Sequence, residues 1–429
     1  MLSLCILYAF LGLLWLVNKK RKGRFLAPSV ILLTAYCLCS LGTLYLYCYE
    51  DAVLDPVAVT YYVVALGMLL LPVVRFDETR LVAIQATDTK SEVCVSYFLA
   101  MLGLYSVAYN CPNLYSALRG NLEDSRMLTT AAEYHVGDTA SVLATYAAYL
   151  FSLMIPLGFY WLATRRRPLL GVALLVGSCS YVVLVLNHVG RDVLIMWGSA
   201  FTFNFLLFRK RLPALARRWI LAGYSVALLI LGVLFLMITS ARFPTGETGP
   251  IYPYANYAGQ SPIHFSEHFL TDRPLGYGKF NFNFAYRAGA LLGLNEYDQD
   301  FLEHSVKETL SSENYFLNVF SSIVGSFFLD FGKDGTIAFV ACVSLVMCLT
   351  LGRGGQRISL PQVILYTMYM QVMTGGIFYY FYYPNVGNGA LAFSVGTAVA
   401  IKYARASKQK SEMTPGFARQ PKAAVTKAV

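Results

Sequence analysis

Long apolar runs separated by short charged connections constrain this chain more than any other feature. A helix needs roughly 20 residues to cross a bilayer, and eleven runs reach or approach that length. They are residues 2–17, 25–47, 57–74, 93–112, 140–163, 169–186, 193–208, 219–239, 336–351, 360–383 and 390–401. Because unpaired backbone groups are costly in lipid and the runs lack the alternation of barrel strands, the sequence predicts an all-α integral membrane protein, a polytopic helical bundle.

The charged residues separate by sign when these spans alternate across a membrane. With the N-terminus outward, the inward segments are residues 19–24, 75–92, 165–167, 209–218, 353–357 and the tail from 402. They hold 25 of the 34 basic residues and 5 of the 24 acidic ones, a net charge of +20, whereas the outward segments sum to −10. Lys and Arg are retained on the cytoplasmic side, so we expect a cytoplasmic C-terminus. The net positive charge of the chain is therefore explained by its membrane topology and does not imply a nucleic-acid partner.

The pattern divides the chain into four parts. Residues 1–239 carry spans 1 to 8, 240–314 form an outward cap, 315–403 form an interfacial helix with spans 9 to 11, and 404–429 form a cytoplasmic tail. The cap is too aromatic for a disordered linker. Its five prolines predict turns and short helices: Pro244, Pro250, Pro253, Pro262 and Pro274.

The two ends of the first span and the cysteines add smaller constraints. The first apolar run has no positive leader and no small-x-small cleavage site, so it predicts an outward-starting anchor and not a signal peptide. Most of the nine cysteines lie within or beside spans, where a thiol is ordinary packing. Cys48 and Cys111 fall at outward ends and could pair in an oxidising compartment.

Two arginines lie at outward span edges. Arg191 begins the seventh span in Asn-His-Val-Gly-Arg-Asp, and Arg242 lies just past the end of the eighth. Charges at such edges usually snorkel or bind something, and a guanidinium fits a phosphate in two-point contact without losing its proton. The alternative is an interfacial ion pair with Asp192 or Glu247. If both arginines line one opening at the outward end of the bundle (the mouth), they favour an anionic ligand.

Other outward residues could complete such a site. Arg273 and Arg287, in the cap, extend the argument for an anion. Histidine or carboxylate could accept the proton of a sugar hydroxyl, although a loop histidine is more often only hydrogen-bonded. The titratable groups best placed to share the mouth are His188, His264, Glu267 and His268.

Three motifs allow competing interpretations. His264-Phe-Ser-Glu267-His268 matches the H-x-x-E-H pattern of inverted zinc proteases, but such a short match arises easily by chance. The aromatic run 378–384 indicates a belt at the outward interface, with stacking on a sugar face as the sharper alternative. Asp330-Phe331-Gly332 resembles a kinase triplet in letters only, because no glycine-rich loop or catalytic loop accompanies it.

With these features, the chain resembles the O-antigen polymerase (Wzy-type) family of oligosaccharide repeat-unit polymerases, membrane glycosyltransferases of the GT-C-like group. The resemblance covers nearly the whole chain. It rests on the many helices, on Gly190-Arg191 before a span, on the large late outward loop, and on the run from Asp330 to Gly335 before the next span. Arg273 and Gly289 also match an Arg-x15-Gly spacing found in some members.

The resemblance implies polymerisation of undecaprenyl-pyrophosphate-linked oligosaccharide into O-antigen or capsule at the periplasmic face of a bacterial inner membrane, without metal or cofactor. A chain-length regulator protein is an implied partner. Arg191 and Arg242 would neutralise the departing pyrophosphate, and His268 or Glu267 would act as base. The implied substrate-binding residues are Arg273, Arg287, His188, His264, Tyr254 and Tyr257.

Two other functions stay open at this stage. An O-antigen ligase would share the loop and the arginines but would transfer the polymer to lipid A. A transporter or flippase would need polar residues lining the bundle at mid-depth, and ionisable residues are almost absent from the span centres. The chain also shows no convincing internal repeat of the kind on which many transporter folds are built.

Overall fold

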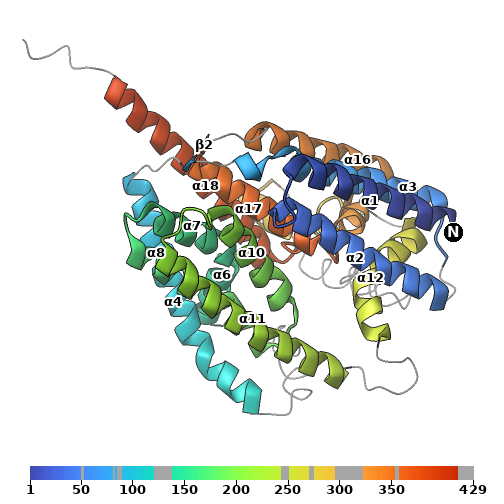
Figure 1. Ribbon diagram of the computed structural model, residues 1–429, viewed down its shortest axis with the longest axis horizontal. Coiled ribbons are helices and arrows are strands. Elements are labelled where there is room, and N and C mark those ends of the chain that lie inside the picture. The colour runs from blue at the N-terminus through green and yellow to red at the C-terminus, as the bar shows by residue number, and fades with distance from the viewer. Residues whose placement is uncertain are drawn as a thin grey trace, which may run out of the picture.

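Helices make up nearly all the regular structure that the computed structural model describes (Figure 1). It describes residues 1–49, 53–80, 83–84, 89–119, 138–242, 251–269, 275–294, 322–352 and 357–413. The helices are α1 (Leu2–Lys22), α2 (Pro28–Tyr49), α3 (Pro56–Arg75), η1 (Glu78–Arg80), α4 (Lys90–Arg119), α6 (Thr139–Tyr149), α7 (Phe151–Thr164), α8 (Pro168–Gly177), α9 (Cys179–Asn187), α10 (Asp192–Phe208), α11 (Ala214–Arg242), α12 (Tyr252–Phe269), α13 (Asn283–Leu291), α16 (Ser322–Leu351), α17 (Leu360–Gly375) and α18 (Asn385–Met413).

The length and apolar composition of the helices confirm the prediction of a helical membrane protein. Within the described residues, seven helices are long and apolar enough to cross a membrane, and the pair α6–α7, bent by 54°, makes an eighth if it is one span. The other three predicted spans correspond to α10, α17 and α18, which do not meet the same measure of length and apolarity. The count of eleven spans therefore stays a prediction.

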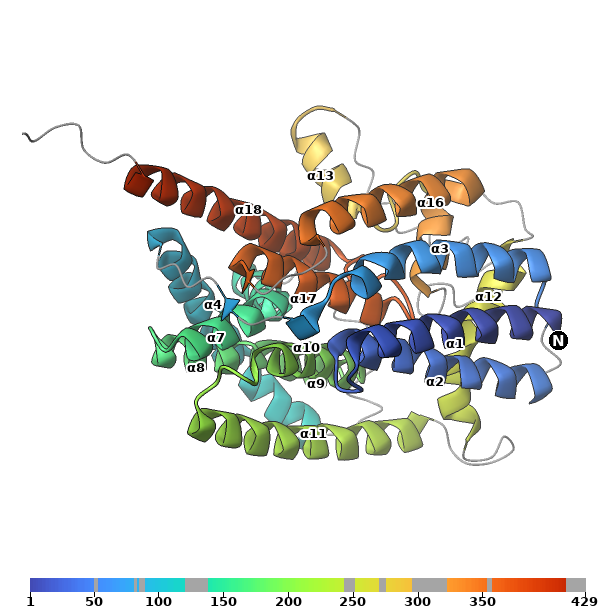
Figure 2. The same ribbon diagram turned by 45° about the horizontal axis from the view of Figure 1, so that its top comes forward.

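The interior of the bundle is formed by α7 and α17, whose side chains are buried on nearly every side. A helix that is apolar all round belongs in such a position. In contrast, only 11% of the apolar window of α11 is buried, and Figure 2 shows α11 along the edge of the bundle. Its exposed apolar surface is suited to contact with lipid.

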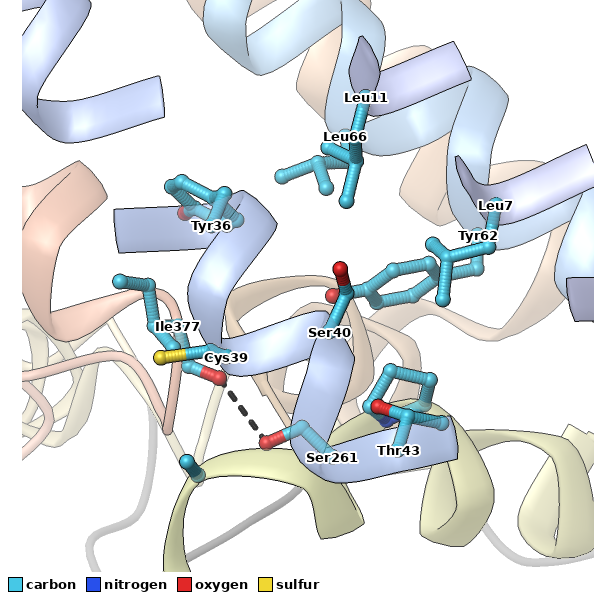
Figure 3. A pocket seen from close by; sticks show the side chains of 12 residues that line it. Leu7, Leu11, Tyr36, Cys39, Ser40, Thr43, Tyr62, Leu66, Ser261 and Ile377 are labelled. Atoms are coloured by element: carbon cyan, nitrogen blue, oxygen red, sulfur yellow. Dashed lines mark hydrogen bonds between the residues drawn. The ribbon is translucent and has the colours of Figure 1, made fainter. Parts of the chain in front are cut away.

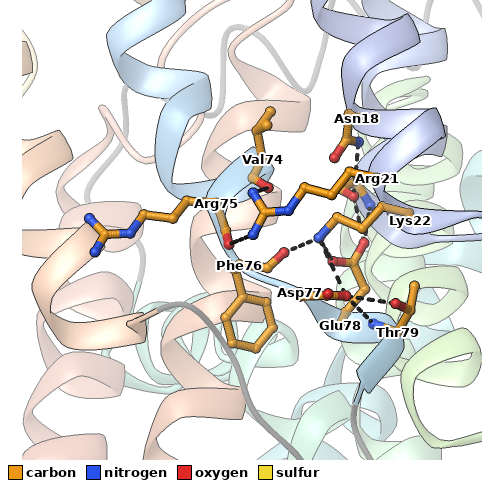
Figure 4. Close-up of polar contacts among 10 residues, drawn as sticks. Asn18, Arg21, Lys22, Val74, Arg75, Phe76, Asp77, Glu78 and Thr79 are labelled. Carbon is orange, nitrogen blue, oxygen red and sulfur yellow. Dashed lines mark hydrogen bonds and ion pairs between the residues drawn. The ribbon is translucent and has the colours of Figure 1, made fainter.

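Three of the basic connections meet at one end of the bundle. The Lys22 Nζ lies 2.6 Å from Glu78 Oε2, which joins the end of α1 to η1 after α3 (Figure 4). Arg24 lines a pocket together with Glu78 and with residues 209–211 of the α10–α11 connection. These contacts bring residues 19–24, 75–92 and 209–218 together, as the alternating topology requires.

The remaining basic connections lie at the same end. Strand β1 (Ala83–Ile84) pairs in parallel with β2 (Arg357–Ile358), which joins the α3–α4 connection to the α16–α17 connection. At the start of α4, Glu92 Oε1 lies 2.6 Å from Arg405 Nε of α18, and Tyr160, near the end of α7, donates to Glu92 Oε2. Figure 1 shows β2 and the end of α18 on the side away from the N-terminus. One end of the bundle is therefore strongly basic.

The C-terminal helix continues further than the sequence pattern predicts. The last span was expected to end near residue 401 and a tail to begin at 404, but α18 runs to Met413 without interruption. Arg405 keeps only 10% of its side chain exposed because its guanidinium pairs with Glu92. The first turns of the predicted tail are therefore part of the packed helix.

The tenth predicted span is interrupted before its apolar run ends. α17 stops at Gly375 rather than near residue 383, and the following backbone is non-helical. The Ser322 amide donates to Phe378 O at 2.7 Å, the Ile323 amide donates to Gly376 O at 2.9 Å, and the Tyr380 amide donates to Ser326 Oγ at 3.1 Å. The start of α16 thus satisfies the backbone groups freed by the break in α17, which makes the break tolerable inside a membrane protein.

The short helix predicted before the ninth span is the first part of α16, and a kink separates it from the rest of that helix. Residues 315–321 of the predicted interfacial helix lie outside the described residues, and α16 begins at Ser322. Gly332 breaks α16 with a φ of 66° and a ψ of −165°, a conformation open essentially only to glycine. A short helix therefore precedes the ninth span, joined to it by a kink.

The outward cap contains one long helix where the prolines predicted short ones. Pro253 lies in the first turn of α12 and Pro262 lies within it, yet the helix has 18 residues. α12 crosses α2 (Figure 2) at a pair of glycines. A Cβ on Gly259 would lie 2.1 Å from Gly42 C, and Thr43 Oγ1 donates to Gly259 O at 2.7 Å. This close backbone contact fixes α12 on the bundle.

Candidate functional site

A tight turn between α9 and α10 positions Arg191. The Gly190 amide donates to Val185 O at 2.9 Å, and Val189 has a φ of 51°. A Cβ on Gly190 would lie 2.6 Å from Val185 Cγ1, so only glycine fits the turn without displacement. Arg191 follows as the residue that caps the start of α10. Gly190 and Arg191 therefore form a turn that leads directly into α10.

The guanidinium of Arg191 is buried where three helices converge. The residue is 8% exposed, and its Nη1 donates to Thr239 Oγ1 of α11 at 3.2 Å. The guanidinium carbon lies 4.7 Å from the ring centroid of Tyr257 in α12 and 5.9 Å from that of Phe235 in α11. A cation over aromatic faces is attracted by the ring quadrupoles. Arg191 and Tyr257, two of the predicted site residues, therefore lie in contact.

The carboxylate of Asp192, the next residue, contacts α9. Asp192 Oδ2 accepts a hydrogen bond of 2.5 Å from the Tyr181 hydroxyl. Charge-assisted bonds of this kind are among the strongest in proteins. Asp192 is thereby tied to α9, while Arg191 is directed toward α11 and α12.

The aromatic run 378–384 lies largely inside the protein, so the interpretation as an interfacial belt is wrong for most of it. Phe378, Tyr380, Phe381 and Tyr382 are 7% exposed or less, whereas Tyr383 is 40% exposed. The ring centroid of Phe378 lies 5.2 Å from that of Tyr257. The run is buried because the end of α17 folds back against the start of α16, and it supports the Tyr257 ring under Arg191.

Three polar side chains of α12 share one face with Tyr257. The spacings from residue 257 to 260, 264 and 267 place these positions along one stripe of the helix. His264 Nε2 lies 3.0 Å from Gln260 Oε1, and His264 Nδ1 lies 3.3 Å from Glu267 Oε2. The side chains of His264 and Glu267 are 29% and 35% exposed. Glu267 lies ten residues beyond Tyr257, or about 15 Å along the helix axis.

The other predicted site residues are distributed more widely. His188 caps the end of α9, three residues before Arg191. Tyr254 is 41% exposed on α12. Arg287 is exposed on α13, which packs against α18. The side chains of Arg242 and His268, and all of Arg273, lie outside the described residues.

The structure also bears on the zinc-protease pattern and on the possible disulfide. No group of three or more His, Cys, Asp or Glu residues that could hold a metal ion occurs among the described residues. His264 and Glu267 pair with each other on α12. Cys48 and Cys111 are free and exposed.

A small cavity adjoins the other face of α12 (Figure 3). It encloses about 20 Å³ between α1, α2, α3 and α12, and its walls include Leu7, Leu11, Tyr36 and Leu66. Ser261 Oγ donates to Ile377 O at 2.9 Å beside it. One water needs roughly 10–15 Å³. The cavity is therefore too small for a sugar and is an internal packing void.

Sequence reasoning missed the role of Asp330. Its Oδ1 accepts from the amides of Gly278 and Phe280 at 3.0 and 3.1 Å, and its Oδ2 accepts from the amide and Nδ2 of Asn281 at 3.0 and 2.6 Å. Asn388 Nδ2 donates to Asn281 O at 2.8 Å. Asp330 is fully buried. The carboxylate therefore fastens residues 276–281 of the outward cap to α16, a role that an isolated acid in an apolar helix could have signalled.

Comparison of the chain with protein families, with curated proteins and with solved structures finds no match.

Proposed function

We propose that this protein is a membrane glycosyltransferase that polymerises lipid-pyrophosphate-linked oligosaccharide units into a surface polysaccharide. The burial of the Arg191 guanidinium at the end of the bundle opposite the basic connections carries the proposal. A buried cation at a span edge is costly, and such residues commonly mark binding or transport sites. A guanidinium matches phosphate oxygens in two-point geometry.

The surroundings of Arg191 suit a sugar attached to a phosphate. Tyr257 and Phe378 offer aromatic faces in mutual contact, and Thr239 offers a hydroxyl. Aromatic rings present apolar faces with a polar edge, which matches the amphipathic faces of a sugar. In the proposed reaction Arg191 stabilises negative charge as lipid pyrophosphate leaves, because that charge develops in the transition state.

The proposed reaction also needs a proton acceptor for the attacking hydroxyl. A non-reducing-end hydroxyl attacks the anomeric carbon, the bond to the pyrophosphate oxygen breaks, and the hydroxyl proton passes to the base. Glu267 is the described candidate, with His264 3.3 Å from its carboxylate. It belongs to the same face of α12 as Tyr257, so a lipid-linked oligosaccharide along that face would reach both residues.

The same proposal assigns the two ends of the bundle to two compartments. The basic end faces the cytoplasm of a bacterium, and the Arg191 end faces the periplasm, because basic connections stay inside. Undecaprenyl-pyrophosphate-linked oligosaccharide is the proposed substrate, the bilayer holds its lipid, and a chain-length regulator protein is a proposed partner.

The test is synthesis by the purified protein. Full-length protein in detergent is incubated with lipid-pyrophosphate repeat units in EDTA, and the products are resolved by gel and mass spectrometry. We expect a ladder of chains that stay attached to lipid pyrophosphate, with one lipid pyrophosphate released per added unit. EDTA should leave the rate unchanged, since the proposed stabilising charge is a guanidinium.

Other products would contradict polymerisation. Transfer of the saccharide to added lipid A, with no ladder in its absence, would identify a ligase. Movement of the intact substrate across proteoliposomes without new glycosidic bonds would identify a transporter. Activity that stops with chelator and returns with zinc would identify metal-dependent chemistry.

A further inference from the structure

A polar pocket lies at the basic end of the bundle, at the opposite end of α10 from Arg191. It encloses about 40 Å³ between the α1–α2 connection, η1 and the α10–α11 connection. This is several times the roughly 10–15 Å³ that one water needs. Its polar lining residues are Arg24, Glu78, Thr79, Arg209, Lys210 and Arg211.

The pocket carries an excess of positive charge. Glu78 is its one acidic lining residue, and the carboxylate of Glu78 is already balanced by Lys22 Nζ at 2.6 Å (Figure 4). The other oxygen of Glu78 accepts from the amide and Oγ of Ser29 at 3.1 and 2.5 Å. Four cationic side chains therefore line the pocket beside one carboxylate, which itself pairs with Lys22.

Arg211 is the most constrained of these cations. Its Nη1 is buried and has no hydrogen-bond partner among the described residues. Partial burial also lowers the pKa of the Arg211 guanidinium, because desolvation disfavours its charged form. A bound oxyanion would satisfy this donor, and buried polar groups are normally satisfied.

The edges of the pocket place it at the depth of lipid headgroups. Phe25 and Leu26, beside Arg24, are 63% and 57% exposed, and Leu215 and Trp219, after Arg211, are 68% and 72% exposed. Lys19 Nζ lies 3.8 Å from the Phe25 ring centroid. Exposed aromatic and aliphatic side chains next to lysine and arginine are typical of the membrane interface. Leu26, Leu206 and Leu207 supply an apolar wall to the pocket itself.

We propose that this pocket binds the phosphate group of an anionic phospholipid from the leaflet at the basic end. The arginines contact the phosphate oxygens, and the leucine wall contacts the glycerol and upper acyl chains. Basic pockets between membrane helices bind lipid headgroups by this combination of charge and apolar contact. The lipid would tie the α1–α2 connection to the α10–α11 connection.

Binding of defined lipids to the full-length protein tests the proposal. Delipidated protein in neutral detergent is titrated with phosphatidylglycerol, with phosphatidylcholine and with inorganic phosphate, and native mass spectrometry counts the bound molecules. The variant Arg209→Gln/Arg211→Gln removes two pocket cations. Its matched control is Arg217→Gln/Arg218→Gln, because these arginines lie near the start of α11, close in sequence to the pocket, are exposed and do not line the pocket.

We expect wild type and control to bind phosphatidylglycerol tightly and the pocket variant to bind it at least about tenfold more weakly, since charge-assisted contacts are lost. Equal binding by the pocket variant and the control would overturn the proposal. Equal binding of phosphatidylglycerol and phosphatidylcholine would also overturn it. Competition by inorganic phosphate at the concentration of the lipid would assign the pocket to a soluble phosphate instead.

A second variant covers the case in which loss of Arg209 and Arg211 prevents folding. Arg24 and Lys210 are exposed residues at the same pocket, so Arg24→Gln/Lys210→Gln should leave the fold intact. This variant should also bind phosphatidylglycerol more weakly than wild type. Unchanged affinity in this folded variant would contradict the proposal.

Discussion

The two ends of the bundle both bury charge, but they hold it in different ways. At the basic end, Lys22 pairs with Glu78 and Arg405 pairs with Glu92, each at 2.6 Å. Each of these two ion pairs joins segments that are distant in the chain, so its role is to stabilise the fold. At the opposite end, the contacts of Arg191 include a threonine hydroxyl and two aromatic rings. These contacts join three helices by a hydrogen bond and by cation–ring contacts; the proposed function places the chemistry at this end and gives the basic end a structural role.

The largest expected effect concerns which compartment each end faces. In a background without native cysteines, Asn113→Cys and Lys402→Cys place single thiols on exposed residues at opposite ends. An impermeant maleimide applied to intact spheroplasts should label position 113 and leave position 402 unlabelled until the membrane is permeabilised. Labelling of position 402 alone would reverse the assignment of the two ends.

The second effect tests the structural role of the buried ion pairs. Lys22→Met should lower the free energy of unfolding by about 3–5 kcal/mol, because it leaves the buried Glu78 carboxylate without its cation. Thermal unfolding in detergent measures the loss, and Arg217→Met, at an exposed site, should change it by less than about 0.5 kcal/mol. Equal stability of the two variants would show that the pair contributes nothing.

A smaller effect is expected where Asp330 fastens the outward cap. Asp330→Asn replaces one acceptor oxygen with an amide that faces backbone donors, at a cost of about 1–3 kcal/mol. Hydrogen exchange at the amides of Gly278, Phe280 and Asn281 should quicken, since each donates to this carboxylate. Asp334→Asn is the control, because Asp334 is exposed. Unchanged protection of the three amides from exchange would show that Asp330 does not hold residues 278–281 against α16.

The sequence predicts the helices well because hydrophobic length is a local property. The positions of most of the long apolar helices, and the grouping of basic connections at one end, could be predicted from composition and charge alone. The early end of α17 could not, because its apolar run continues to Tyr383. The break depends on hydrogen bonds between residues 322–326 and 376–380, which are distant in the chain.

The candidate site was predictable only in part, for the same reason. Arg191 was found because a charge at a span edge is conspicuous in the sequence. Its contact with Tyr257 joins residues far apart in the chain and needed the fold. Asp330 was noted as part of the run from Asp330 to Gly335, and its structural role depends on partners at residues 278–281, which are likewise remote in the chain.

The most direct test of the central claim compares the loss of one arginine at each end. Purified Arg191→Ala and Arg217→Ala proteins are matched for folded protein by unfolding temperature and assayed for elongation of lipid-pyrophosphate repeat units. Arg191→Ala should lower turnover about a hundredfold, by roughly 3 kcal/mol of transition-state stabilisation. Arg191→Lys should recover part of the rate, because it keeps the charge but loses the fork, and Arg217→Ala should match wild type. Full turnover by folded Arg191→Ala would contradict the account.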